Sequence, residues 1–474
     1  MVTLKQVASV NVPSAWSEFN PSATPVGRGA VFSPTYPIFV FDYQTGQIAV
    51  GYVVGSNGNS VYNQADANYL ITDAIFFSPF GLNYAMGGGG ICGYGTGCMG
   101  NGGAVCGPWW MVADLNNNAV SYYCHGFIPD NSVTAHFQGI AIDFENGNIL
   151  FSFSGLTSHD FVVVAIPLSY LSSVISNQAP SSIMSIWLEA PASVSSPSIY
   201  RVPFTLFQGN FVQPFSSSEG VYLLVIPLST LYSNMSSGMP SSSGSPTSLG
   251  AYYPVLPQVT SLGVPLAVVY YNGRSAVIKV GATYKGNFYV ATVSPSFSVA
   301  KSNSFPINGS YFDATLSWWS GVFIVPGISN NTVYVNVYRD VYEYATTTGS
   351  YVAVTGQGYV IVAQQPLNSS TVTFVIYQVL LDRTYAFQNV NIAVAGQNVV
   401  ATGRLVDLNT GSPVPNAVVY LLQLDSLEST FTGDGQVVAT GTTDSNGNFS
   451  ITYTAPSGVN PNNYYYAVYY HAEQ

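Results

Sequence analysis

The chain has 474 residues, a formal net charge of −11 at pH 7 and only 7% charged residues, whereas ordinary soluble domains carry about 25%. Lys and Arg together number ten, and none lies between Arg28 and Arg201. This pattern argues against nucleic-acid binding, because phosphate backbones attract the opposite charge. No apolar stretch reaches the roughly 18 to 20 residues of a transmembrane helix.

The N-terminal region combines an alternating apolar run, from Val2 to Val12, with a Ser/Pro/Gly linker up to residue 30. It has no continuous apolar segment of the kind found in signal peptides, so we expect a signal peptide to be absent or already removed. An extracellular type of composition without an export signal fits a virion protein assembled inside its host. It fits a mature secreted protein equally well.

One apolar sequence motif occurs twice, from Val162 to Leu171 and from Tyr222 to Leu231. In both copies, Pro-Leu-Ser follows the apolar run. Such a run predicts a strand buried on both faces whose hydrogen-bond ladder ends at the proline. The repetition predicts a repeated supersecondary unit. Short helical turns are expected directly afterwards, over 168–176 and 228–236.

Strand-like segments continue along most of the chain in groups about fifty residues apart. Hairpins are predicted over 36–54, with a Gln-Thr-Gly turn, and over 139–153, with an Asn-Gly turn. Further groups lie over 69–123, 199–231, 266–299, 311–344 and 351–385. The sequence therefore predicts an all-β fold whose body is either a β-propeller-like repeat of about seven blades or a set of tandem β-sandwiches. In a propeller, the run from Val2 to Val12 would supply the closing strand of the last blade.

The pattern changes from about residue 395. Gly403, Asp407 and the Pro-Val-Pro-x-Ala stretch over 413–417 precede a Thr-Asp-Ser-Asn-Gly-Asn-Phe stretch over 443–449. Together these resemble the carboxypeptidase-regulatory or transthyretin-like β-sandwich module, which implies an Ig-like sandwich with a structural or adhesive role. The predicted division is a strand and linker over 1–30, a repeat body over 31–390 with a Cys/Gly-rich loop over 86–126, and the sandwich over 391–474.

The four cysteines, Cys92, Cys98, Cys106 and Cys124, lie in or near a glycine-rich stretch. Two disulfides are expected, with all three pairings open. The alternatives are a zinc site that uses Cys124 and His125, although the paired spacing of zinc ligands is missing, and free thiols.

Other candidate residues have simple structural explanations. Asp143 and Glu145, and likewise Asp444, precede Asn-Gly turns and are interpreted as turn residues rather than calcium ligands or catalysts. The adjacent pairs Trp109, Trp110 and Trp318, Trp319 are possible glycan contacts, although core packing is the simpler explanation. Possible N-glycosylation sites are Asn234, Asn308, Asn330, Asn368 and Asn448.

No catalytic motif, metal site or cofactor site is predicted, and no enzymatic activity is expected. The composition resembles that of crenarchaeal virion surface proteins, which implies a spike, turret or tail component at the virion surface. Such a protein would form homo-oligomers, or contact other surface proteins, and would bind a host glycan or protein. The alternatives are a cellular surface-layer or secreted adhesion protein, and a secreted glycan-active enzyme.

Overall fold

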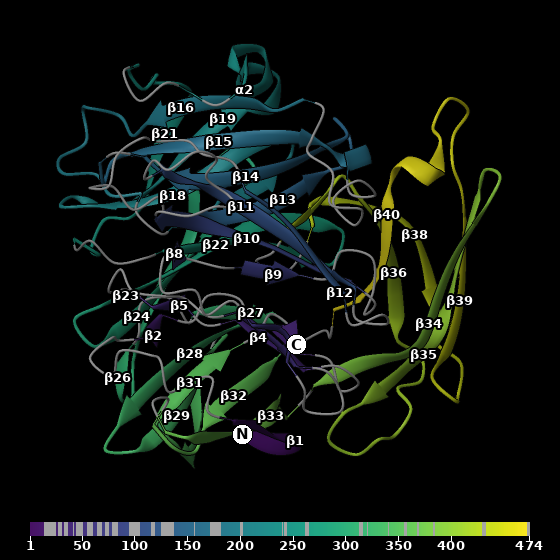
Figure 1. The fold of residues 1–474 in the computed structure, drawn as a ribbon. Coiled ribbons are helices and arrows are strands. Elements are labelled where there is room, and N and C mark those ends of the chain that lie inside the picture. Colours follow the sequence, from purple (N-terminus) through teal and green to yellow (C-terminus); the bar gives the residue numbers. More distant parts are fainter. Residues whose placement is uncertain are drawn as a thin grey trace.

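The computed structural model describes residues 1–13, the strands between residues 25 and 124, and residues 137–471 with short gaps. These gaps are 156, 171–181, 200–201, 239, 241–243, 261–264, 312–315, 320, 340, 355–357, 367–368, 383 and 429–432. The fold is all-β, as the sequence predicts, with a body of antiparallel sheets and a separate sandwich beside it (Figure 1). In the described ranges, no helix is long and apolar enough to cross a membrane.

The body consists of seven antiparallel sheets that follow one another along the described chain, which is the organisation of a β-propeller. We call them blades 1 to 7. Blade 1 contains β3 (Val31–Phe32), β4 (Pro37–Val40), β6 (Gly51–Val54) and β7 (Ser60–Asn63), and the short pair β2 (Pro25–Val26) and β5 (Asp42–Tyr43) accompanies it. Blade 2 contains β8 (Tyr69–Ile71), β9 (Ile75–Phe77), β10 (Tyr84–Gly93), β11 (Val105–Asp114) and β12 (Ala119–Cys124).

Blades 3 and 4 contain the two copies of the repeated motif. Blade 3 contains β13 (Phe137–Asp143), β14 (Asn148–Ser154), β15 (Asp160–Pro167), β16 (Met184–Glu189) and β20 (Ser236–Ser237). Blade 4 contains β17 (Thr205–Phe207), β18 (Asn210–Ser217), β19 (Gly220–Pro227) and β21 (Ala251–Leu256). The repeat occupies the third strand of each blade, β15 and β19, and both strands are almost entirely buried and end at their proline. The helical turns follow as predicted, with η2 over Leu168–Tyr170 and α2 over Leu228–Asn234.

Blades 5 and 6 share an apolar core. Blade 5 contains β22 (Leu266–Asn272), β23 (Ser275–Tyr284), β24 (Asn287–Val293) and β25 (Val299–Pro306). Blade 6 contains β26 (Ser310–Tyr311), β27 (Ser317–Trp319), β28 (Val322–Ser329), β29 (Thr332–Tyr338) and β30 (Tyr342–Thr348).

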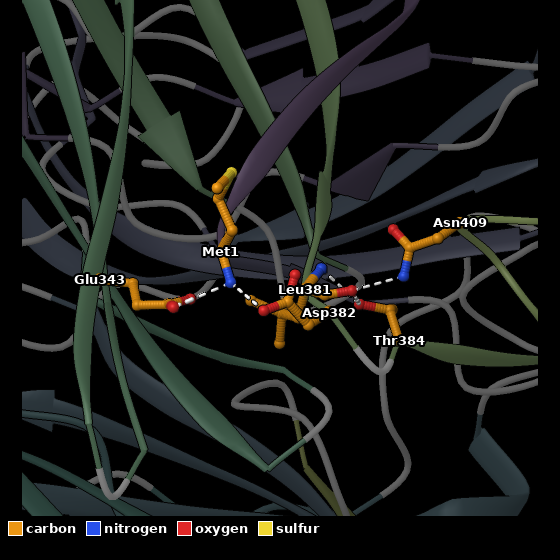
Figure 2. A network of polar contacts seen from close by, with 6 residues as sticks. All are labelled: Met1, Glu343, Leu381, Asp382, Thr384 and Asn409. Atoms are coloured by element: carbon orange, nitrogen blue, oxygen red, sulfur yellow. Dashed lines mark hydrogen bonds and ion pairs between the residues drawn. The ribbon is translucent and has the colours of Figure 1, made fainter.

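The N-terminal strand completes blade 7, which confirms the predicted closure. Blade 7 contains β31 (Tyr351–Val354), β32 (Tyr359–Ala363), β33 (Thr371–Leu380) and β1 (Thr3–Pro13). β1 runs antiparallel to β33, from Thr3 opposite Leu380 to Pro13 opposite Thr371. At this joint the Met1 amino group contacts Glu343 and Asp382, and the Asn409 amide donates to the Leu381 carbonyl (Figure 2).

The sandwich follows blade 7 and consists of two three-stranded sheets around one core. One sheet contains β34 (Tyr385–Ala395), β35 (Asn398–Asp407) and β39 (Asn448–Thr454); the other contains β36 (Val418–Leu424), β38 (Gly435–Thr442) and β40 (Tyr465–Tyr470), which follows the turn η3 (Pro461–Asn463). Buried Val399, Val419 and Ile451 come from both sheets and fill the space between them.

Candidate functional site

Between β36 and β38, the described residues 425–428 and 433–434 leave the sandwich and pack against the body. Their strand β37 (Ser426–Glu428) pairs with β13, so that Ser426 lies opposite Asp143 and Glu428 opposite Ala141. Blade 3 thereby gains a strand from the far end of the chain (Figure 1). We call the described residues 425–428 and 433–434 the docking segment.

Glu428 connects the docking segment to blade 4. Its side chain is buried, the Leu206 amide donates to Oε1 at 2.6 Å, and the Thr205 hydroxyl donates to Oε2. Burial raises the pKa of this carboxyl to about 8, although the hydrogen bonds from Thr205 and Leu206 act in the opposite direction. The group is therefore predominantly protonated and uncharged in acid and at neutral pH.

Asp434 and Asp425 flank Glu428 in the docking segment. The Gln208 amide donates to Oδ2 of Asp434, whereas the buried Oδ1 has no hydrogen-bond partner. Burial raises the pKa of Asp434 to about 7. Burial, followed by the nearby Glu145 and Asp143 carboxylates, raises the pKa of Asp425 to about 6. The interface between sandwich and body thus uses carboxyl groups that fit best without charge.

A pocket between blades 5 and 6 is the second candidate site. Its floor consists of four aromatic side chains, Tyr270, Trp318, Phe323 and Tyr338. Its polar wall consists of Lys279, Thr292, Lys301, Asn303 and Arg339. Three of the ten basic residues of the chain therefore line one pocket. Among the described lining residues there is no carboxylate.

The strand register of blade 5 positions the two lysines. Lys279 on β23 lies opposite Thr292 on β24, and Thr292 lies opposite Lys301 on β25. The three side chains therefore form one row across the same face of the sheet. Lys279 Nζ donates to Thr292 Oγ1 at 2.7 Å and lies 5.4 Å from the centre of the Tyr270 ring. The cavity volume is about 50 Å³.

The pocket is not predicted from the sequence, although the sequence contains a signal for it. No carboxylate occurs between Glu219 and Asp313, while Arg274, Lys279, Lys285 and Lys301 all lie in that interval. Blade 5 is thus locally basic in an acidic chain. A local charge count would have identified the blade, but only the register shows which cations converge.

A wider depression lies beside blade 3, with a cavity volume of about 320 Å³. Trp187, Asn234 and Thr247 line it together with serine, glycine, isoleucine and proline residues. Its described lining contains no ionisable side chain, so it offers hydroxyl and amide contacts only.

The predicted tryptophan contacts have different environments. Trp318 is buried and forms part of the pocket floor, whereas Trp319 is half-buried and packs against the core of blades 6 and 7. Trp109 and Trp110 lie on β11, opposite Cys124 and Gly88 respectively, and their side chains lie outside the described part of the chain.

For three of the four cysteines, the structure describes the position of the backbone but not that of the side chain. Cys92 on β10 lies opposite Cys106 on β11, Cys124 lies on β12, and Cys98 is outside the described residues. The two disulfides stay a prediction.

The predicted glycosylation sites are dispersed. Asn234, Asn330 and Asn448 are exposed, and Asn368 lies outside the described residues. Asn308 is half-buried, with its side-chain amide donating to the Tyr342 hydroxyl and its backbone amide to Asn336.

The acidic turns have the expected structure. The Asp143 carboxylate accepts hydrogen bonds from the backbone and side-chain amides of Asn146, and Asp444 accepts from the backbone amides of Asn446 and Asn448. Asp143 also accepts from the Tyr232 hydroxyl at 2.6 Å. Within the described ranges, no group of three or more His, Cys, Asp or Glu side chains is arranged to hold a metal ion.

Neither a protein-family model nor a curated protein matches the chain. The structure is similar to prolyl oligopeptidase B from Galerina marginata, with a TM-score of 0.39, 10% identity and coverage of 83% of this chain and 57% of that one. It is also similar to the AfRom2 CNH domain, with a TM-score of 0.38, 8% identity and coverage of 81% and 100%. The exo-beta-1,3-galactanase from Phanerochaete chrysosporium gives a TM-score of 0.24, 13% identity and coverage of 68% and 95%. The chain spans little more than half the length of the oligopeptidase, and likeness at these scores carries no argument about activity.

Proposed function

We propose that this chain is a non-catalytic structural and adhesive protein of an acidic exterior, and specifically a spike, turret or tail component of an archaeal virion that contacts the host envelope. The observation that carries the proposal is the interface between the docking segment and the body, which we call the dock. Glu428, Asp434 and Asp425 all have a raised pKa, so the two parts of the molecule are held together best when these carboxyls are protonated.

The composition supports the same environment. With 7% charged residues, the surface is solvated mainly by hydroxyl and amide groups, whose hydration does not depend on pH. The sandwich, with its resemblance to transthyretin-like modules, supports a structural or adhesive role rather than a chemical one. Its outer strand β34 carries mostly exposed side chains and is available for contacts with other copies or with neighbouring surface proteins.

Electron microscopy of the native particle or cell envelope, with the protein located by a labelled antibody, tests this proposal. We expect symmetric copies at regular projections of a virion. Finding the protein in a cell-wall lattice, or free in the medium, would replace the virion role by the cellular surface or secreted alternative. A control antibody against an internal particle protein should label only disrupted particles.

A further inference from the structure

We propose that the pocket between blades 5 and 6 binds a single oxyanion, a carboxylate or a sulfate, carried on a saccharide. The inference deepens the proposed adhesive function by naming the class of surface ligand, and it rests on that function only for its biological setting. The pocket itself is defined by Lys279, Lys301 and Arg339 above an aromatic floor.

Three basic side chains line the pocket. Lys279 and Lys301 lie on either side of Thr292 in one row, and Arg339 reaches the pocket from the end of β29 in blade 6. Cations gathered in a concave site with low-dielectric walls focus a positive potential there, although the chain as a whole carries a net charge of −11. An oxyanion above Thr292 would lie between both ammonium groups, while the fork of Arg339 favours a planar or tetrahedral oxyanion.

The side chain of Lys279 is preorganised for binding. Lys279 is held by its hydrogen bond to Thr292 and by its position over the Tyr270 ring. The ring is in turn fixed by an edge contact with Trp318 at 5.6 Å between centroids. A cation held in this way loses less conformational entropy on binding than a free surface lysine.

The small volume of the pocket limits the ligand group that can enter it. Pockets that enclose a whole drug-sized ligand measure about 300 to 1,000 Å³, whereas this cavity measures about 50 Å³. It has room for one small charged group and not for a sugar ring. The remainder of the ligand must therefore lie outside, which suits an acidic residue on a glycan chain at a surface.

The inference is tested by titrating the full chain at pH 5 and low salt and measuring binding by NMR or calorimetry. The probes are glucuronate, glucose 6-sulfate, glucose and inorganic sulfate. We expect both acidic sugars to bind in the millimolar range, glucose not to bind, and the affinity to fall several-fold when salt rises from about 20 to 200 mM. Lys301→Gln and Arg339→Gln change exposed side chains and should each weaken binding at least fivefold. Lys285→Gln is the matched control, because it removes the same charge from the turn between β23 and β24 and should leave the affinity unchanged.

Several results would overturn the inference. Equal affinities for glucose and glucuronate would show that the anionic group does not contribute to binding. A loss of affinity in the Lys285→Gln control equal to that in the pocket variants would show that only the overall charge matters. If inorganic sulfate bound as tightly as glucose 6-sulfate, the saccharide would contribute nothing to the affinity, and that part of the inference would be wrong. Binding of only one acidic sugar would support the pocket and identify the oxyanion as a carboxylate or a sulfate. A protein found at a particle surface that binds neither acidic sugar would refute the pocket ligand and leave the proposed function standing.

Discussion

The closure of the body and the docking of the sandwich both add one strand to a sheet formed elsewhere in the chain, but by different physical means. β1 pairs with β33 along ten residues, and many of its side chains point to solvent. β37 pairs with β13 along only three residues, and its side chains are mostly buried. The first joint is therefore held mainly by backbone hydrogen bonds, and the second mainly by side chains.

The comparison shows where pH can act on this molecule. The backbone ladder itself has no ionisable group, and the ion pairs of the Met1 amino group with Glu343 and Asp382 are exposed at the end of the joint, so closure should depend on pH less than the buried contacts of the docking segment do. The dock contains three carboxyls whose pKa values are raised by burial, and its strength must change as they ionise. A surface with few charged residues therefore does not make the stability of the protein independent of pH, because the buried carboxyl groups still titrate.

Deletion of residues 1–13 should have the largest effect, because it leaves β33 as an open edge and removes Val2 and Leu4 from the core of blades 6 and 7. With a net contribution near 1 kcal/mol per hydrogen bond, we expect a loss of about 5 to 10 kcal/mol, measured by denaturant unfolding. A synthetic peptide of residues 1–13 should restore part of the stability. An unchanged unfolding midpoint would show that β1 is dispensable and that the comparison is wrong.

Among the point substitutions, Glu428→Ala should have the largest effect. The substitution leaves the buried Leu206 amide and Thr205 hydroxyl without their acceptor and creates a cavity, at a cost of about 3 kcal/mol. Glu428→Gln is the matched control, since an amide resembles the protonated carboxyl. It should cost less than about 1 kcal/mol at pH 5. Equal losses for both variants would argue that the carboxyl is ionised in the native protein.

The wild-type chain should be most stable in acid. Each raised pKa means that the folded state holds its proton more tightly than the unfolded state, so the stabilisation is complete below about pH 4 and is lost as pH rises through about 6 to 8. The pKa of Glu428 rises from its ordinary value of 4.5 to about 8, so at about 1.4 kcal/mol per pKa unit this group alone accounts for a loss on the order of 5 kcal/mol. Urea unfolding from pH 4 to 9 measures this slope, which Glu428→Gln should flatten. A wild-type stability that increases from pH 5 to 8 would contradict the assignment.

The sequence predicted the features whose cause is local. Gly147 readily adopts the positive φ that the tip of the hairpin requires, and Pro167 and Pro227 end the repeated strands because proline has no backbone N–H to donate. The closing strand was also predictable, since a repeat of blades needs one strand to complete the last.

The two candidate sites depend on long-range contacts. Glu428 and Leu206 are 222 residues apart in the sequence, and nothing near Glu428 distinguishes it from an exposed glutamate. In the same way, Lys279, Thr292 and Lys301 are brought into one row by the register of three strands. A change of one residue in either register would have placed a lysine on the opposite face.

Tyr271→Phe should have the smallest effect and should separate the parts of the dock that titrate from those that do not. The Tyr271 hydroxyl donates to the Gly433 carbonyl at 3.2 Å in a buried position, so its loss should cost about 1 kcal/mol. Burial and the nearby carboxylates raise the pKa of this hydroxyl well above its usual value, so it stays protonated throughout the accessible range. The variant should therefore shift the whole stability curve from pH 4 to 8 downward without changing its slope, whereas Glu428→Gln should change the slope. Tyr252→Phe, at an exposed hydroxyl that contacts Ser193, is the control and should cost less than about 0.5 kcal/mol. If Tyr271→Phe also flattens the curve, the hydroxyl and the carboxyls act as one network, and the pH response belongs to the dock as a whole rather than to its acidic groups.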